Sequence, residues 1–258
     1  MTPPRTLAVV QARLSSSRLP GKVLMPLHGM PMILFMLARV RRTTRIDEIV
    51  LATSTDASDD PLADAVAAAG YTVHRGPLDD VLARFVGAVE PRAADWVVRL
   101  TGDCPLIDPA IVDRVISQAQ SERLDYCTNA DPASFPDGLD VEVCTRAALL
   151  ASATDARLQS EREHVTLFIR NHPERFRLNH LRAVADLSAL RWTVDHADDL
   201  ALVQALVAAI AARGGDPLQA DLFDLLRVVS EQPQLAHANL HQRNEGLLKS
   251  LQADTPIS

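Results

Sequence analysis

Short apolar runs alternate with amphipathic segments along the first half of the chain. Three runs, residues 7–10, 49–52 and 96–100, consist almost wholly of apolar side chains, which is typical of strands buried on both faces. Four segments between or after them place apolar side chains at helical spacing: residues 32–41, 61–69, 78–89 and 109–121. This order of elements predicts a mostly parallel sheet with helices on both faces and right-handed crossovers.

The pattern becomes less regular in the second half. Residues 139–143 alternate apolar and acidic side chains, which predicts a strand with one polar face. Residues 176–184 and 191–194 also have the character of strands. Three further helices are expected, at residues 146–155, 160–171 and 198–212. For residues 237–258, a docked helix and a loose terminus are both open alternatives.

Composition and charge exclude several classes of protein. Of the 258 residues 47% are hydrophobic and 23% charged, which suffices for a full core and argues against disorder. A net charge of -7 argues against a general nucleic-acid binder, which usually has a basic surface. The three cysteines lack CxxC spacing, and no apolar stretch approaches membrane-spanning length. We therefore expect a cytoplasmic protein without a leader that binds neither nucleic acid nor membrane.

The loop after the first apolar run holds a concentration of positive charge. Residues 11–22 read Gln-Ala-Arg-Leu-Ser-Ser-Ser-Arg-Leu-Pro-Gly-Lys, so Arg13, Arg18 and Lys22 share one loop. Open α/β sheets bind ligands at the carboxyl ends of their strands, which is where this loop lies. Arginine grips phosphate oxygens in pairs and lysine acts as a point charge, so a triphosphate suits the loop. Neither a Walker A motif nor G-x-G-x-x-G matches, and a solvated surface loop is the alternative.

Two aspartates follow later apolar runs. Asp103 lies in Gly-Asp-Cys-Pro-Leu-Ile, which begins at Gly102 where the third run breaks into a loop, and Asp195 follows residues 191–194. We expect both at the sheet edge that carries the basic loop, where carboxylates can hold Mg²⁺. The alternatives are a turn role for Asp103 and, for Asp198 and Asp199, stabilisation of a helix N-terminus.

Several of these motifs together resemble those of the sugar-acid cytidylyltransferases. That superfamily includes the 3-deoxy-manno-octulosonate and acylneuraminate enzymes, and the branch of the spore-coat polysaccharide biosynthesis protein SpsF is the most similar. The resemblance covers the loop at residues 11–24, Gly29-Met30-Pro31-Met32, the motif at Gly102, and Val-Asp-x-x-x-Asp-Leu from Val194. It extends to residues 136–143, residues 161–166 and Arg243-Asn244-Glu245-Gly246, and so spans nearly the whole chain.

The resemblance implies roles for individual residues. In that superfamily the first loop wraps the triphosphate of CTP, and the two aspartates ligate magnesium. It therefore implies magnesium on Asp103 and Asp195, with Arg13 and Lys22 joining them as catalytic residues. The residues that it implies for nucleotide binding are Ala12, Arg13, Leu14, Ser15, Arg18, Lys22, Thr101, Gly102 and Asp103. Thr101 stands where the 3-deoxy-manno-octulosonate enzymes have a base-reading Gln, so CTP itself is inferred from the family.

The acceptor is expected on the second half of the chain. Asp140 and Glu142 lie two residues apart and therefore project from one face of the predicted strand. With Arg162 and His164 they are the residues that we expect to bind an anionic small-molecule acceptor. For His164, a surface or core histidine with a satisfied hydrogen bond is the alternative.

The fold and reaction that follow are those of a magnesium-dependent enzyme. The resemblance implies a Rossmann-like (GT-A-type) α/β fold. Since the chain shows no internal repeat and no linker, we expect one domain, with residues 1–108 as the nucleotide-binding half, residues 109–236 as the acceptor-binding half with a substrate-facing insertion, and residues 237–258 as a tail. It implies transfer of CMP from CTP to an acidic sugar or related acceptor, with release of pyrophosphate, in surface polysaccharide or glycoconjugate biosynthesis. The oligomeric state is open, with a homodimer among the alternatives.

Two other functions compete with this one. A GT-A-type glycosyltransferase would normally carry an Asp-x-Asp metal motif, and Gly102-Asp103-Cys104 is not one. A non-catalytic nucleotide-binding protein is the second, and the presence of both aspartates and all three loop cations argues against it.

Overall fold

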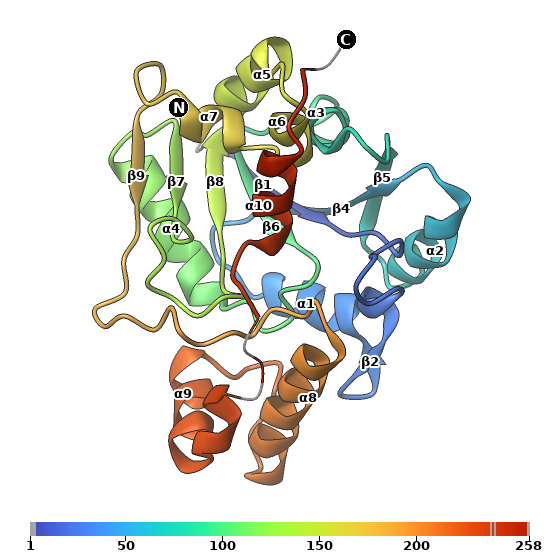
Figure 1. The fold of residues 1–258 in the computed structure, drawn as a ribbon, viewed down its shortest axis with the longest axis vertical. Coiled ribbons are helices and arrows are strands. Elements are labelled where there is room, and N and C mark those ends of the chain that lie inside the picture. Colours follow the sequence, from blue (N-terminus) through green and yellow to red (C-terminus); the bar gives the residue numbers. More distant parts are fainter. Residues whose placement is uncertain (1–3, 238, 240, 257–258) are drawn as a thin grey trace.

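The computed structural model describes residues 4–237, 239 and 241–256, and its centre is a seven-stranded sheet (Figure 1). The strand order is β5-β4-β1-β6-β8-β7-β9, and β8 alone runs antiparallel to its two neighbours. The strands of this sheet are β1 (Thr6–Gln11), β4 (Glu48–Ser54), β5 (Thr72–Gly76), β6 (Trp96–Thr101), β7 (Tyr126–Thr128), β8 (Glu142–Thr145) and β9 (Leu178–His180). A two-stranded hairpin, β2 (Pro26–Leu27) and β3 (Met30–Pro31), stands apart from it.

The helices connect the strands and extend beyond the sheet. They are α1 (Met32–Val40), α2 (Asp60–Ala68), α3 (Val81–Val89), α4 (Pro109–Ser121), α5 (Arg146–Asp155), α6 (Gln159–Glu163), α7 (Leu167–Asn171), α8 (Ala197–Ala212), α9 (Leu222–Glu231) and α10 (Glu245–Gln252). Short 3-10 turns are η1 (Lys22–Leu24), η2 (Ala57–Asp59) and η3 (Pro233–His237). Helices α8 and α9 pack on each other at one end of the molecule, at the bottom of Figure 1.

The central strands are apolar on both faces, and helices cover both faces. In β1, Ala8 and Val10 belong to one core and Leu7 and Val9 to the other, as the alternation of side chains in a strand requires. Helices α1, α2, α4, α8 and α9 contribute to the first core, and α3, α5 and α7 to the second. The predicted α/β fold with a mostly parallel sheet is therefore confirmed.

The predicted strand at residues 191–194 is wrong in a way that matters for the site. Within this segment only Arg191 forms a β-bridge, to Asp137, and the segment passes between the loops that contain Asp137 and Asp103. The backbone N–H of Trp192 donates to Asp137 (2.6 Å) and that of Val194 donates to Asp103 (2.8 Å). These two bonds place the start of the following loop, and hence Asp195, beside the loop that carries Asp103.

Other boundaries differ because backbone conformation changes locally. The predicted helix at residues 160–171 is two short helices, since Val165 between them has a φ of +45° that no helix accommodates. The predicted strands at residues 139–143 and 176–184 are β8, shifted toward the carboxyl end, and the shorter β9. Strand β5, the β2–β3 hairpin and α9 were not predicted.

The tail contains a docked helix within its described residues. Helix α10 lies in front of β1 and β6 in Figure 1 and touches α6. Among the helices that the structure describes, none combines the length and the apolar character needed to cross a bilayer.

Candidate active site

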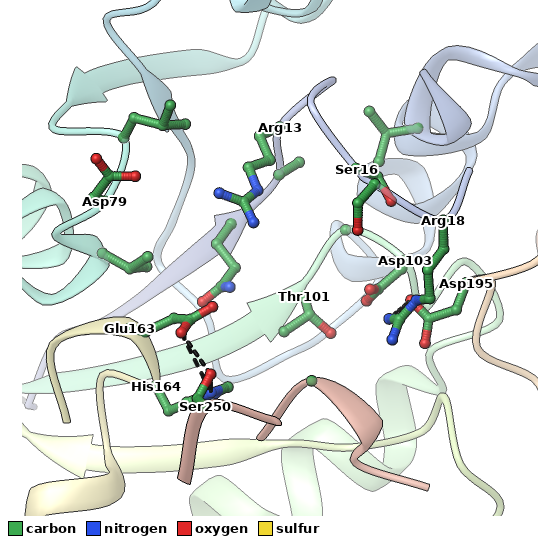
Figure 2. Close-up of a pocket in the computed structure, with 18 of the residues that line it drawn as sticks. Arg13, Ser16, Arg18, Asp79, Thr101, Asp103, Glu163, His164, Asp195 and Ser250 are labelled. Atoms are coloured by element: carbon green, nitrogen blue, oxygen red, sulfur yellow. Dashed lines mark hydrogen bonds and ion pairs between the residues drawn. The ribbon is translucent and has the colours of Figure 1, made fainter. Parts of the chain in front are cut away.

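A cavity of about 540 Å³ opens where β1 and β6 end (Figure 2). The loop after β1 forms one wall, and the floor consists of Thr101 at the end of β6 and of Gly102 and Asp103, which follow it. The opposite wall comes from α6 and α10, which are far away in sequence. The residues that these walls contribute are Gln11, Ala12, Arg13, Ser16, Ser17, Arg18, Lys22, Gln159, Glu163, His164, Gly246, Lys249 and Ser250.

A second cavity of about 240 Å³ adjoins the first. The residues common to both are Gln11, Thr101, Asp103, His164, Asp195 and Gly246. The second cavity is lined mainly by charged side chains, with three arginines facing a larger number of carboxylates: Arg99, Arg170, Arg191, Asp131, Asp137, Asp140, Glu142 and Glu245. Asp103 and Asp195 thus stand where two polar compartments meet.

A left-handed glycine sets the direction of the basic loop. Gly21 has a φ of +72°, a conformation that is costly for residues with a Cβ, and its N–H donates to Leu14 (2.9 Å). The turn starts η1, whose first residue is the buried Lys22. On the other side of the loop, Asp59 accepts a hydrogen bond from the N–H of Leu14 (2.7 Å). The loop is therefore held at both ends, with its cations turned to the cavity.

Gly102 allows the loops after β1 and β6 to touch. A Cβ on Gly102 would lie 2.8 Å from Ala12 Cβ and 3.1 Å from the Gln11 carbonyl oxygen, which leaves no room for a side chain. The N–H of Gly102 also donates to that carbonyl (2.8 Å). Because of this contact, Asp103 emerges directly beside the basic loop.

Lys22 joins the two predicted metal ligands. Its Nζ donates to Asp103 Oδ2 (3.0 Å), Asp195 Oδ1 (2.9 Å) and the Val194 carbonyl (2.7 Å). Burial alone would lower the pKa of Lys22, but the carboxylates of Asp103 and Asp195 outweigh it and raise that pKa. The ammonium is therefore charged at neutral pH, and both aspartates lie within reach of a single cation.

Asp195 is surrounded by positive charge. Arg18 Nη2 lies 2.6 Å from its Oδ1, and Arg191 Nη2 lies 3.0 Å from its Oδ2. Burial opposes ionisation of Asp195, yet Lys22 and Arg18 hold its pKa far below the usual value. Asp103 and Asp195 offer carboxylate oxygens on adjoining loops, and this donor set fits Mg²⁺, which commonly takes only one or two carboxylates from protein.

A second acidic group lies near the site and stabilises the structure around it. Among the described residues, Asp198, Asp199 and His241 place potential metal-binding atoms within 4.8 Å of one another. However, Asp199 accepts from Arg191, Asn239 and the N–H groups of Asp195 and His196, and Asp198 pairs with His241 (2.8 Å). Asp199 thus caps the start of α8 and holds Arg191, which in turn holds Asp195.

Most of the predicted nucleotide-binding residues line the larger cavity. Figure 2 shows Arg13 reaching into it and Arg18 beside Asp103 and Asp195. Leu14 and Ser15 are exceptions, because the loop turns them away, and Ser16 and Ser17 line the cavity instead. The predicted residues that do line it are Ala12, Arg13, Arg18, Lys22, Thr101, Gly102 and Asp103.

Asp140 and Glu142 both face the smaller cavity, but in different electrostatic states. Glu142 pairs with Arg99 and accepts hydrogen bonds from Tyr126 (2.6 Å) and Thr166. Burial opposes its charge, but Arg99 and these donors lower the pKa of Glu142 to about 2. Burial raises the pKa of Asp140 to about 7, although Arg243 acts in the opposite direction. Glu142 is thus a fixed anion, whereas Asp140 can exchange a proton near neutral pH.

Of the other two predicted acceptor residues, one lies in the site and one does not. His164 lines both cavities and shares a hydrogen bond with Ser250 of α10 (3.1 Å), and burial together with Arg99 lowers its pKa, so its ring is neutral at pH 7. Arg162 lines neither cavity. Its guanidinium donates to Asp80 at the start of α3 and to the Ala153 carbonyl, because α6 turns this side chain toward α3 and α5.

Sequence reasoning missed several residues that the structure brings to the site. Arg99 and Arg191 each lie four residues before one of the predicted metal ligands, Asp103 and Asp195. This closeness in sequence could have indicated that they belong to the site. Arg170 and Lys249 had no such signal, because they come from short helices whose docking depends on tertiary contacts.

Comparisons with known proteins identify relatives of this chain. The family model described as Cytidylyltransferase matches residues 7–205. The spore coat polysaccharide biosynthesis protein SpsF of Bacillus subtilis (strain 168) is 32% identical over 237 residues, which cover 89% of this chain and 96% of that protein.

Two solved structures are similar in fold. A cytidylyltransferase from Leptospira borgpetersenii serovar Hardjo-bovis (strain JB197) matches with a TM-score of 0.86 and 27% identity, over 93% of this chain and 100% of that one. CMP:2-keto-3-deoxy-manno-octonic acid synthetase complexed with CTP matches with a TM-score of 0.62 and 21% identity, over 80% of this chain and 99% of that one. With the family match over most of its length, the chain belongs to the cytidylyltransferase family and is a nucleotidyltransferase.

Proposed function

We propose that this enzyme transfers CMP from CTP to an acidic sugar or related acceptor with release of pyrophosphate. The observation that carries the proposal is the position of Asp103 and Asp195 between two polar cavities. The basic loop walls one cavity, and the charged side chains that we expect to bind the acceptor line the other. The named relatives support CTP and a role in surface polysaccharide or glycoconjugate biosynthesis. We place the reaction in the cytoplasm, since all three cysteines are free thiols.

The larger cavity would hold the nucleotide. Arg13 and Ser16 face the space beside β1, and Arg18 and Lys22 stand at the junction with the smaller cavity. Their charges would bind the phosphates and offset the negative charge that builds on the departing pyrophosphate. The floor at Gly102 brings this phosphate region within reach of Asp103.

Asp103 and Asp195 would hold Mg²⁺. When bound, the metal would supply positive charge that offsets the negative charge developing on the phosphate in the transition state. Arg191 would keep Asp195 oriented, because it binds Asp195 while being fixed itself by Asp137 (2.6 Å) and Asp199 (3.1 Å).

The smaller cavity would hold the acceptor. Among the residues that the structure describes, hydrogen bonds to Asp137 and Asp140 use only one oxygen of each carboxylate, which leaves the other able to accept from a sugar hydroxyl. Within the described part of the chain, Arg170 donates to Asp131 through Nη2 only, which leaves further N–H donors for an anionic group of the acceptor. We therefore assign the anionic group of the acceptor to Arg170 in place of Arg162.

In the reaction, an acceptor oxygen forms a bond to the α-phosphorus while the bond from that phosphorus to the bridging oxygen of pyrophosphate breaks. If the acceptor oxygen is a hydroxyl, its proton must move to a base. Asp140 lines the acceptor cavity and has a pKa of about 7, so it is suited to receive that proton.

The test is a pyrophosphate-release screen. The four nucleoside triphosphates are combined with sugar acids, polyol phosphates and phosphonates, with Mg²⁺ present or chelated. Release that needs CTP, an acceptor and Mg²⁺ together is the expected result. In a parallel incubation with nucleotide-sugars in place of the triphosphates, release of a free nucleoside diphosphate would instead identify a glycosyltransferase.

A further inference from the structure

The distribution of lysine along the chain is unusual. Of 26 lysine and arginine residues only two are lysines, Lys22 and Lys249. Lys22 follows β1 and Lys249 lies on α10, yet both line the 540 Å³ cavity. On a solvated helix surface, lysine and arginine serve equally well as cations, and this chain has arginine at nearly all such positions. Confinement of both lysines to one cavity therefore indicates that the cavity requires compact ammonium groups.

Glu245 connects the second lysine to the basic loop. Its Oε1 lies 2.7 Å from Lys249 Nζ, and its Oε2 lies 3.1 Å from Arg18 Nη1. One carboxylate thus binds two cations of the cavity at once. A phosphate group could take the place of this carboxylate, because it would also present negatively charged oxygens to Lys249 and Arg18.

Helix α10 is attached by polar contacts. No residue of α10 is buried, and its attachments near the site are hydrogen bonds from Ser250 to Glu163 (2.6 Å) and between Ser250 and His164 (3.1 Å), drawn in Figure 2. Beyond the helix, Ser160 donates to Asp254 (2.7 Å). A helix held in this way can shift when the ions at its amino end change partners.

We propose that Lys249 is a phosphate ligand of the bound nucleotide, and that Glu245 is a counter-ion which holds Lys249 and Arg18 until a triphosphate displaces it. The inference rests on the proposed function, because it requires a nucleoside triphosphate in the larger cavity. Lys249 is two-thirds exposed (66%), so its ammonium is reachable by a ligand entering there. The contrary view is a surface pair at helical i,i+4 spacing with no ligand role.

The presence of only two lysines makes a direct test possible. Protein produced with lysine labelled at ¹³Cε gives one signal for each lysine, assigned with Lys249→Arg. We expect titration with CTP and Mg²⁺ to move both signals with a common midpoint. Movement of Lys22 alone would overturn the role of Lys249 and leave the proposed function standing. No movement of either signal with any triphosphate would contradict the proposed function itself.

Calorimetry tests the counter-ion. Lys249→Ala should weaken CTP binding roughly tenfold and Lys249→Arg much less, because it keeps the charge. Glu245→Gln should tighten CTP binding several-fold, since it frees two cations. Glu231→Gln, which removes an ion pair with Arg213 outside both cavities, is the matched control and should change nothing. Weaker CTP binding by Glu245→Gln would show that Glu245 only anchors α10 and would overturn its displacement.

Discussion

At the scale of single residues, the charges of Asp103 and Asp195 are the feature most exposed to test. Asp103→Asn and Asp195→Asn should each reduce turnover at least a hundredfold, because a preorganised charge of this kind contributes several kcal/mol to the transition state. Asp198→Asn is the matched control, since Asp198 is acidic and close in sequence but lines neither cavity. Pyrophosphate release measures the effect, and circular dichroism checks the fold. Turnover near that of the unmodified enzyme in either variant would exclude these residues as metal ligands.

Asp140 should control the pH dependence of the acceptor step. Burial raises the pKa of Asp140 to about 7, so the carboxylate able to take a proton forms as the pH rises through that value. We expect kcat to increase from pH 6 to pH 8 in the unmodified enzyme. In Asp140→Asn, kcat should be lower and should no longer increase between pH 6 and pH 8, while the CTP affinity measured by calorimetry stays the same. If kcat of the variant still increased over this pH range, the titrating group would be another residue.

At the scale of elements, the turn at Gly21 places the cations of the basic loop. Gly21→Ala should lower the free energy of unfolding by about 1 kcal/mol, because alanine is strained at a positive φ. The same change should raise the KM for CTP, since Lys22 follows directly. Gly70→Ala is a close control: Gly70 also has a positive φ (+83°) and open space around it, but it lies after α2. Both variants should lose similar stability in urea unfolding, and only Gly21→Ala should lose CTP affinity.

At the scale of the whole molecule, the two cavities should bind their ligands separately. Arg13 lines only the larger cavity and Arg170 only the smaller one. Arg13→Ala should raise the KM for CTP about tenfold with little change in the KM for the acceptor, and Arg170→Ala should do the reverse, since each loses charge-assisted hydrogen bonds to one ligand. Equal effects of both variants on CTP would mean that the smaller cavity is part of the nucleotide site.

Much of the architecture followed from local sequence pattern. The apolar runs at β1, β4 and β6 and the helices between them were predicted because burial on both faces leaves few polar positions in such strands. The site position of Gly102 and Asp103 was also predictable from local sequence. These residues directly follow a predicted strand, and the carboxyl end of such a strand lies at the ligand-binding edge of the sheet.

What the sequence by itself determined, then, is the set of parallel strands β1, β4 and β6, the basic loop after β1 and the acidic position after β6, because each depends on neighbours close in the chain. Tertiary structure alone decided which distant segments complete the site. Asp195 reaches Asp103 because Trp192 and Val194 bind the backbone of two remote loops. Arg162 turns to Asp80 while Arg170 faces the cavity, because a positive φ at Val165 separates α6 from α7. Helix α10 brings Lys249 to the site through polar contacts with residues some 80 or more positions away, and no local periodicity records such contacts.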